Sequence, residues 1–331
     1  MVQRRSSLAS DLDVELNMLG FLLNRIGTML LTMLVISMLV FFIAAVVPVD
    51  PARSALGQYA PQQSVDELRE KMGLDRPVVV RYVDWISNLL RGDFGESIHF
   101  RRPVRDLVSV RLERSLTLAA LGFAFMIPLG LALGCIAGIN EGKLLDRIIS
   151  LTSSIFVSVP SFASGIFLIV IFSLWLGWLP GVSMPDPDDS FLESSKKLIL
   201  PILVLALDEI GYLARMTRVS MAEVMESDYI RTALLKGIPK IKIIWRHALR
   251  NAFIAPFTAI MLHVNWLIGG VVVVEVLFNY PGLGRLLLDA ALRNDVTLLM
   301  GGTLVLTFVA VSTQLIADIG IYFMNPRIRF E

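Results

Sequence analysis

The chain carries little charge for its length. Only 18% of its 331 residues are Asp, Glu, Lys or Arg, whereas about a quarter of the residues in a soluble globular domain are charged. The 30 basic and 29 acidic residues leave a formal net charge of +1, which indicates no nucleic-acid partner. With 55% hydrophobic residues and a mean hydropathy of +0.68, this composition is typical of an integral membrane protein.

Cysteine and the common catalytic motifs are almost or wholly absent. The one cysteine, Cys135, lies inside an apolar run, so an internal disulfide is excluded and a cysteine-ligated metal site is not expected. There is no phosphate-binding loop of the form G-x-x-x-x-G-K-[ST], because the Gly142–Lys143 pair is followed by leucine. H-E-x-x-H and the nucleophile elbow are missing too. We therefore expect no enzyme activity, catalytic residue, metal site or cofactor in this chain.

Long apolar runs are the dominant feature. A helix needs about 20 apolar residues to cross ~30 Å of hydrocarbon. The first run is longer than the ~7–15-residue core of a signal peptide and lacks a convincing cleavage site, so we expect a retained helix. The third run is long enough to tilt or to bend at Pro160. The sequence thus predicts an all-α membrane protein with six transmembrane helices, over 26–47, 116–139, 148–178, 198–217, 252–278 and 297–324.

Lysine and arginine in the loops indicate the orientation. They gather in 1–25, 143–147, 215–251 and 327–329, and the positive-inside rule puts these segments in the cytoplasm. The short loops on the other side hold only Lys196, Lys197, Arg285 and Arg293. The long segment between the first two spans also has arginines, but long segments cross membranes largely regardless of charge. We expect both termini in the cytoplasm.

The first outer segment, 48–113, has the pattern of a small folded module. A capping-box pattern begins at Ser64, and Gly73 is a plausible helix stop. Pro77 suits the first position of a second helix, and Pro103 opens a third. The sequence predicts three short helices outside the cytoplasm. The alternative is an amphipathic surface that lies on the membrane.

A basic, helix-prone segment, DYIRTALLKGIPKIKIIWRHALRN at 228–251, lies between two apolar runs. Ser227 or Asp228 can cap a short helix over 229–236, and Gly237 can end it. Membrane topology alone would account for a basic loop on the cytoplasmic side. The cap and the stop indicate a structured element instead.

This segment resembles the EAA loop by which permease subunits of ABC importers contact their ATPases. In that family the loop carries an alanine and, four residues on, a glycine, here Ala233 and Gly237. Arg231 and Thr232 stand where the family has a glutamate and its first alanine. The order DY-x-RTA-x-x-KG followed by HALRN is similar to that of the peptide, nickel and opine permeases.

Other segments extend the resemblance over about residues 20–330. MGLDRP and RYVDWISNLLRGDFGES in the outer segment are similar to the N-terminal region of the peptide, nickel and opine permeases, which other ABC importer permeases lack. SVPSF, LGWLPG, VVVVEVLFNYPGLGRLLLDA and NPRIR also stand where that family has them. The chain is therefore similar to a B-type dipeptide or oligopeptide permease along most of its length.

The resemblance implies a fold and a division of the chain. The fold would be the six-helix type I ABC importer permease, with a small helical extracytoplasmic insertion between helices 1 and 2. Residues 1–25 would be a cytoplasmic tail, and 26–113 the first transmembrane helix with the outer module. A five-helix transmembrane domain would follow over 114–326, with a cytoplasmic coupling loop at 218–251, and 327–331 would be a second tail.

The resemblance also implies a function and partners. The chain would be a permease subunit of an ATP-driven, binding-protein-dependent importer in the bacterial inner membrane, forming half of the translocation pathway. Its partners would be a homologous second permease, making a heterodimer, one or two ATPase subunits that bind ATP and Mg, and an extracytoplasmic substrate-binding protein. The 228–237 helix would couple to the ATPase through Asp228, Tyr229, Arg231, Thr232, Ala233 and Gly237.

Polar residues within the spans are candidates for the translocation pathway. Asp208 and Glu209 lie roughly 15 Å in from the outer end of their span, where a carboxylate costs at least a few kcal/mol unless it faces water or a partner. They either line a cavity for a cationic or amino-bearing solute, or pair with Arg215 or with the second permease. His263 and Asn265 are further candidates, although such residues also hydrogen-bond between helices.

Three glycines in the second span form a ridge of small residues. Gly130, Gly134 and Gly138 recur every four residues, which allows another helix to approach closely. The partner helix belongs either to this subunit or to the second permease.

Two other classes of protein are alternatives. An ATP-independent secondary transporter or channel would show paired repeats or broken helices with ion-binding residues, and would leave the 228–251 loop unexplained. A membrane enzyme would need a cluster of nucleophiles or metal ligands, which the sequence lacks. The transported solute stays open among peptides, opines, nickel chelates, glutathione and sugar conjugates.

Overall fold

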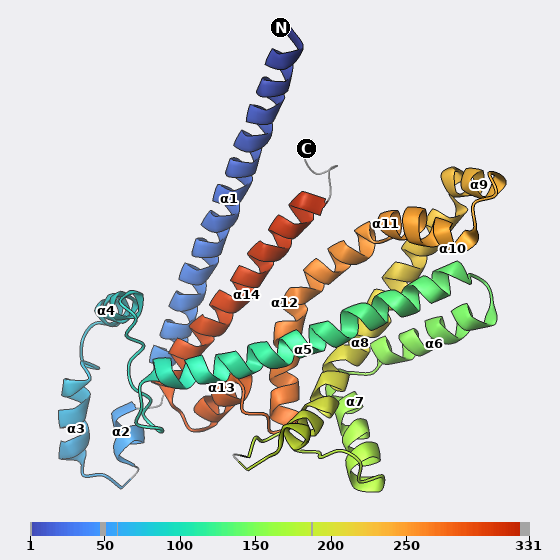
Figure 1. Cartoon of the computed structure of the whole chain (residues 1–331). Helices are drawn as coiled ribbons and strands as arrows, with labels where there is room; N and C mark the ends of the chain where they lie inside the picture. The colour runs from blue at the N-terminus through green and yellow to red at the C-terminus, as the bar shows by residue number, and fades with distance from the viewer. Residues whose placement is uncertain (1, 47–50, 58, 187, 325–331) are drawn as a thin grey trace. The chain divides into compact units, whose positions relative to one another are not determined.

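The structure of the chain is a computed structural model. It describes the backbone of residues 2–46, 51–57, 59–186 and 188–324, and the side chains of 20–46, 51–57, 59–186, 188–264 and 269–321. Throughout these residues the regular elements are helices, apart from one isolated bridge between Glu96 and Pro103 (Figure 1). The chain forms two compact units, one mainly Met1–Arg111 with Leu286–Tyr322, the other mainly Leu112–Arg285.

The first unit contains both ends of the chain and the outer segment. Its helices are α1 (Val2–Val46), α2 (Pro51–Leu56), α3 (Gln62–Lys71), α4 (Val78–Leu90), the first two turns of α5 (Val104–Ile139), most of α13 (Leu283–Leu292) and α14 (Val296–Met324).

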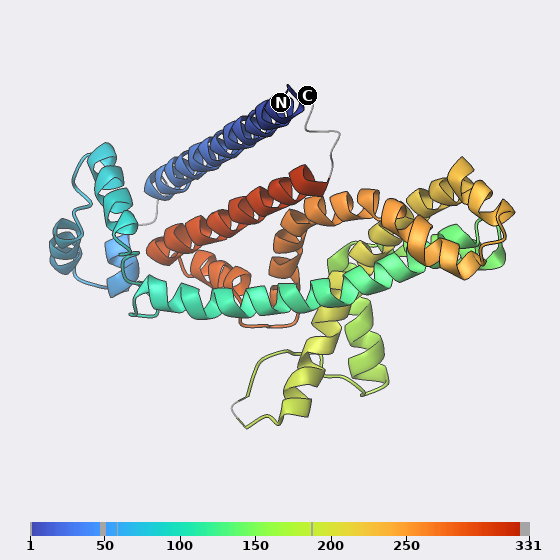
Figure 2. The same ribbon diagram turned by 45° about the horizontal axis from the view of Figure 1, so that its top comes forward.

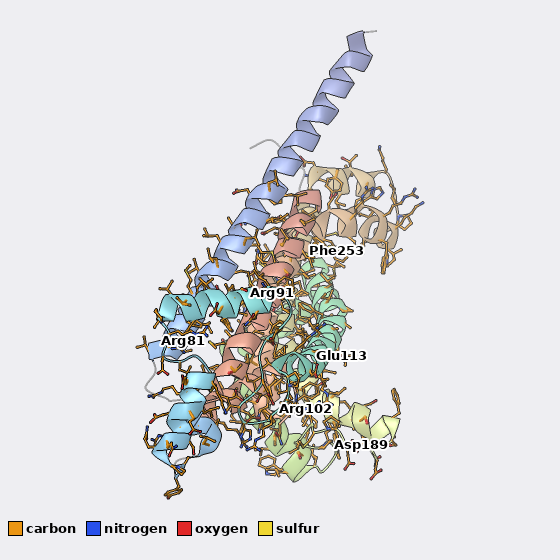
Figure 3. All side chains as sticks on the ribbon, turned by 90° about the vertical axis from the view of Figure 1, so that its left-hand side faces the viewer. Arg81, Arg91, Arg102, Glu113, Asp189 and Phe253 are labelled. Atoms are coloured by element: carbon orange, nitrogen blue, oxygen red, sulfur yellow. The ribbon has the colours of Figure 1, made fainter. Side chains whose placement is uncertain are left out.

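An aromatic cluster joins α4 to α1. The ring centroid of Phe41 lies 5.4 Å from those of both Tyr82 and Trp85. The Tyr82 hydroxyl is also 2.8 Å from Ser37 Oγ, so its polar end is satisfied where the ring is buried. Figure 3 shows the side chains of this unit, with Arg81 labelled near the start of α4. Helix α4 of the outer segment is thus packed onto the first long helix.

Two helix starts in the outer segment differ from those that the sequence predicted. Pro61 is the N-cap of α3, so Ser64 lies inside the helix and the predicted capping box there is wrong. Pro77 is likewise the N-cap of α4 rather than its first helical residue. In both cases a proline, whose φ is already near its helical value, precedes the helix and sets its start.

The third predicted helix of the outer segment is not a separate element. The helix that follows Pro103 begins at Val104 and continues without a break to Ile139 as α5. Pro103 does stand immediately before a helix, as expected. The division expected after residue 113 falls inside α5.

The second unit holds the remaining helices. They are α5 from Leu112 onward, α6 (Leu144–Ser158), α7 (Ser161–Leu168) with the π-helix η1 (Ile169–Trp175), α8 (Phe191–Glu226), α9 (Asp228–Leu235), α10 (Lys240–Ile243), the π-helix η2 (Ile244–Ala248), α11 (Leu249–Ala252) and α12 (Ile254–Leu277).

Helix α8 is the centre of the second unit. It starts with a capping box, in which Ser190 Oγ accepts from Glu193 N at 3.3 Å and Ser190 N donates to Glu193 Oε2 at 2.9 Å. Helices α5 and α6 run alongside it in both ribbon views (Figures 1 and 2). The hydrophobic core of this unit joins α8 to α5 and α12, and its fully buried residues include Leu118, Leu200, Val274 and Phe278.

The glycine ridge of α5 packs against α8. A Cβ built on Gly130, Gly134 or Gly138 would lie 2.9, 2.4 or 2.7 Å from the nearest atom of α8. Only hydrogen fits at these positions, so the two backbones approach closely. The structure thereby confirms the alternative in which the ridge packs within this subunit.

The third apolar run bends sharply. Leu144–Ser158 and Ser161–Trp175 meet at an angle of 105°, and Pro160 is the N-cap of α7. Proline lacks the N–H that would continue the hydrogen bonds of α6, so the helix breaks there. Of the two alternatives for this run, a tilt or a bend at Pro160, the structure shows the bend.

The described residues give a range for the number of membrane spans. Three helices are long and apolar enough to cross a membrane, Gly20–Val46, Val104–Ile139 and Val296–Ile321, and two bent pairs bring the number to as many as five. The expected span at 198–217 lies within α8, which carries Asp208, Glu209 and Arg215 there and is not among them. By length and composition, the described residues thus contain three to five segments that could cross a membrane.

Candidate functional site

The segment between α8 and α12 folds as a compact group of short helices, α9, α10, η2 and α11. Helix α8 ends at Glu226, Ser227 is extended with ψ of 149°, and α9 begins at Asp228. At the other end Gly237 has φ of +73°, a left-handed conformation that glycine adopts without steric cost. The short helix and its glycine stop lie where the sequence predicted them.

The start of α9 is not capped in the predicted manner. Ser227 occupies the N-cap position, but its hydroxyl donates backward to Val224 O at 2.5 Å instead of accepting from α9. Asp228 is the acidic residue of the first turn, where its negative charge favours the positive end of the helix dipole. The helix is held instead by packing.

One face of α9 is anchored to the chain's own core. Ile230 and Ala233 are buried in a cluster with Met221 of α8 and with Ile243 and Ala248 of the following helices. Ala233 therefore allows close packing within this subunit, and it is not available to contact a partner. This differs from the expectation that Ala233 is one of the residues through which the helix contacts the ATPase.

The opposite face of α9 is exposed and partly apolar. Leu235 is 83% exposed, and Arg231, Thr232 and Gly237 are exposed as well. Tyr229 is 43% exposed, and its hydroxyl accepts from Asn251 Nδ2 at 2.9 Å. The six predicted coupling residues thus lie in α9 or directly after it, and all of them except Ala233 are exposed to solvent.

An ion pair at the base of α8 was missed by the sequence analysis. Arg218 donates to both carboxylate oxygens of Asp146, with Nη2 2.8 Å from Oδ2. Asp146 also accepts from Gly142 N at 2.9 Å, so one side chain ties the α5–α6 turn to α8. Asp146 is only 3% exposed. The sequence signal was an acidic residue at the very start of an apolar run.

A second site lies closer to the start of α8, around Glu209. Glu209 is 4% exposed, and its Oε2 is 2.8 Å from His263 Nδ1 on α12. The imidazole ring of His263 also stacks near Tyr212, with ring centroids 4.1 Å apart. Asp208 and Glu209 both line a cavity of about 330 Å³. Three of the predicted pathway residues are thus brought together by two helices.

Two expectations about this second site have other outcomes. Arg215 is exposed and forms no ion pair within the described part of the chain, so the structure does not show the alternative in which Arg215 pairs with the α8 carboxylates. The helical backbone places Asn265 in α12, but its side chain lies outside the described residues.

Glu275 is a functional candidate that the sequence analysis quoted within a motif but gave no role. It is fully buried in α12, and it accepts from Ser115 Oγ and, at 3.1 Å, from Arg285 N. A carboxylate inside an apolar run is costly unless it is paired, and that cost was the available signal. Its partners close the turn that leads into α13.

Two family models match the chain. Residues 130–330 match the binding-protein-dependent transport system inner membrane component, and residues 18–118 match the N-terminal part of a binding-protein-dependent transport system membrane component. Together the two matches extend over nearly the whole chain.

Curated relatives align along almost their full length. A putative peptide transport system permease protein of Brucella abortus is 38% identical over 314 residues, which is 95% of this chain and 100% of the relative. The glutathione transport system permease protein GsiC of Escherichia coli K12 is 35% identical over the same shares.

A solved structure supports the fold. A chain of the MetNI methionine ABC transporter, in its inward-facing conformation, superposes with a TM-score of 0.51 and 17% identity, covering 66% of this chain and 94% of that one. Since one family model alone covers more than half of the sequence, the chain belongs to the binding-protein-dependent transport system inner membrane components, and it is a permease subunit of an ABC importer.

Proposed function

We propose that α9 is the element through which this permease couples to an ATPase subunit. The observation that carries the proposal is the division of α9 into two faces. Ile230 and Ala233 fix the helix to the core of its own unit, while Leu235 is left 83% exposed. A short helix that is rigidly held on one side can transmit a push from a closing partner into α8 and α12.

The arrangement of the subunit in the membrane follows from this role. We infer six spans, with the polar helix α8 as the fourth, and both termini, α9 and the 218–251 loop on the cytoplasmic side. The outer segment within 26–113 lies on the other face and contacts the binding protein. The two family matches, which end at 118 and begin again at 130, support a division of the chain near α5.

The partners and the solute are part of the same proposal. A second, homologous permease completes the pathway, ATPase subunits bind ATP and Mg, and a binding protein delivers the solute. Relatives named for peptide and glutathione transport support a peptide or a small peptide-like solute. Asp208, Glu209, His263 and Asn265 belong to the half of the pathway that this chain contributes.

The experiment compares two exposed leucines. Leu235→Ala on α9 removes a side chain that would be buried against the ATPase, and we expect a loss of about 1.5–3 kcal/mol of binding free energy, roughly 10–100-fold in affinity. Leu144→Ala is the matched control, because Leu144 is 73% exposed at the start of α6. Co-purification of the ATPase and solute uptake are measured for both variants.

The outcome separates the proposal from its alternatives. Reduced ATPase association for Leu235→Ala, with a normal Leu144→Ala variant, supports coupling through α9. Equal and unimpaired association of both variants contradicts it. Uptake that needs no ATPase would support the alternative, an ATP-independent secondary transporter or channel.

A further inference from the structure

The cavity beside Asp208 and Glu209 has acidic residues on an otherwise apolar wall. It lies within the second unit, between the α6–α7 bend, α8 and α12, and it holds about 330 Å³. Val157, Val204, Leu205 and Val273 supply apolar surface to it. A small apolar cavity with a few convergent polar groups has the usual composition of a ligand site.

Glu209 is buried, and one of its carboxylate oxygens is unpaired among the described residues. Its Oε2 lies 2.8 Å from His263 Nδ1, a contact that is not aligned as a hydrogen bond, and among the described side chains its Oε1 has no hydrogen-bond partner although the side chain is only 4% exposed. Buried carboxylate oxygens are normally satisfied, and leaving one without a donor costs its full desolvation. The unpaired oxygen therefore points to a missing donor.

The charge balance of the cavity indicates what kind of donor is missing. None of the described residues that line it is basic, and the nearby Arg215 is exposed to solvent. A protonated His263 can neutralise one carboxylate, and a neutral one neutralises none. With both carboxyls ionised, at least one negative charge is left for a ligand to balance.

We propose that this cavity is a subsite for a primary ammonium group attached to a short aliphatic chain. An ammonium has three N–H donors and no acceptor, which suits Glu209 Oε1 and the oxygens of Asp208. His263 Nδ1 lies 2.8 Å from Glu209 Oε2 on the other side of the carboxylate, and Tyr212 packs on the imidazole at 4.1 Å between ring centroids. The apolar walls accept the aliphatic part of the ligand.

The size of the cavity limits what enters it. A volume of about 330 Å³ lies at the lower end of the range of roughly 300–1,000 Å³ for ligand pockets. One residue-sized group fits, so a transported peptide would place its amino-terminal residue here and the rest elsewhere in the pathway. The inference rests on the proposed function, because the cavity must open to a translocation pathway.

Direct binding to the intact transporter tests the subsite. The complete complex, with its second permease and ATPases but without the binding protein, is reconstituted in nanodiscs and titrated calorimetrically at pH 6.5. Leucinamide supplies the ammonium and the aliphatic side chain, and N-acetyl-leucinamide keeps the side chain without the charge. We expect leucinamide to bind at least tenfold more tightly. Equal affinities, or no binding of leucinamide, overturn the proposal.

Variants locate the binding within the chain. Asp208→Asn and Glu209→Gln keep size and hydrogen bonding while removing one charge, and each is expected to weaken leucinamide binding about tenfold. Asp188→Asn, in the exposed loop before α8, is the matched control and should bind as the wild type does. Unchanged binding by both cavity variants contradicts the assignment. The comparison of the two ligands on the wild type does not depend on how any variant folds.

Measuring ATPase association in the same preparations separates two kinds of failure. If the complex retains its ATPases but binds leucinamide and N-acetyl-leucinamide equally well, only the proposed subsite is contradicted. If the chain never co-purifies with an ATPase, the proposed coupling function is contradicted, whichever ligand the chain binds.

Discussion

At the scale of single residues, buried polar groups in this chain find partners far away in the sequence. The carboxylate of Glu275 accepts from Ser115, which is 160 residues earlier, and from the backbone of Arg285. A Cβ at Gly282 would lie 2.0 Å from Glu275 Oε1, so a glycine is needed where the turn passes over the carboxylate. Glu275 thus holds together the turn between α12 and α13.

Replacing Glu275 tests this role. Glu275→Ala leaves the Arg285 N–H and the Ser115 hydroxyl without their acceptor in a buried place, and we expect a loss of about 1–3 kcal/mol of stability. Glu275→Gln retains an amide oxygen as acceptor and should lose less. Thermal unfolding of the two variants in the same detergent measures the difference. Equal midpoints for Glu275→Ala and the wild type would show that the network contributes nothing.

The partners of polar residues are the part that the sequence could not predict. The spacing on α8 puts Arg215 near the carboxylates along one helix, and that neighbour was the only one visible in the sequence. The structure pairs Glu209 with His263 on α12 instead. Such a contact depends on how two helices pack, which neither periodicity nor composition reports.

At the scale of elements, the long apolar helices and the helix ends and breaks at glycine and proline were predictable. The runs that became α1, α5 and α14 are apolar over more than 20 residues, and Pro160 broke the third run where expected. Helix starts were less predictable, because Ser64 had the pattern of a cap but Pro61 lies just before it. A local pattern identifies an element, while its first residue depends on competing local signals.

The glycine ridge offers a test of packing between α5 and α8. Gly134→Ala would place a methyl group 2.4 Å from Thr217 Cβ and 2.5 Å from the Ala214 carbonyl oxygen, and backbone cannot move aside cheaply. We expect about 1–3 kcal/mol of destabilisation. Gly122→Ala on the same helix is the control, since its nearest atoms in Leu205 lie at an ordinary 3.6 Å. Thermal unfolding that is equally affected in both variants would contradict this packing.

The glycine stop of α9 gives a second test at this scale. Gly237 has φ of +73° with no atom near its missing Cβ, so Gly237→Val adds backbone strain of about 1–2 kcal/mol without a clash. Gly142→Val in the α5–α6 turn is matched, with φ of +74° and equally open space. We expect similar losses of stability, but reduced uptake and ATPase association only for Gly237→Val. Normal coupling by that variant would mean that the exit from α9 has no role in contacting the ATPase.

At the scale of the whole molecule, the count of spans and their direction depend on α8. Its apolar stretches are interrupted by Asp208, Glu209 and Arg215, so composition alone does not mark it as a span. The same helix can cross the membrane because the carboxylate of Glu209 is buried and faces His263 on α12 rather than lipid. With α8 as a span and both bent pairs crossing once, the chain crosses six times.

Six crossings place the outer segment and the α5–α6 turn on opposite sides of the membrane, and cysteine labelling distinguishes the two sides. Cys135→Ala first removes the one native thiol. In that background, Ser64→Cys lies at an exposed position of α3 and Lys143→Cys at an exposed position before α6. If both termini are cytoplasmic, an impermeant thiol reagent reacts with Ser64→Cys once the outer membrane is permeabilised. Lys143→Cys then reacts only after the inner membrane is broken. The reverse pattern would put α9 outside, where no ATPase could reach it, and labelling of both positions in intact cells would mean that α5 does not cross the membrane.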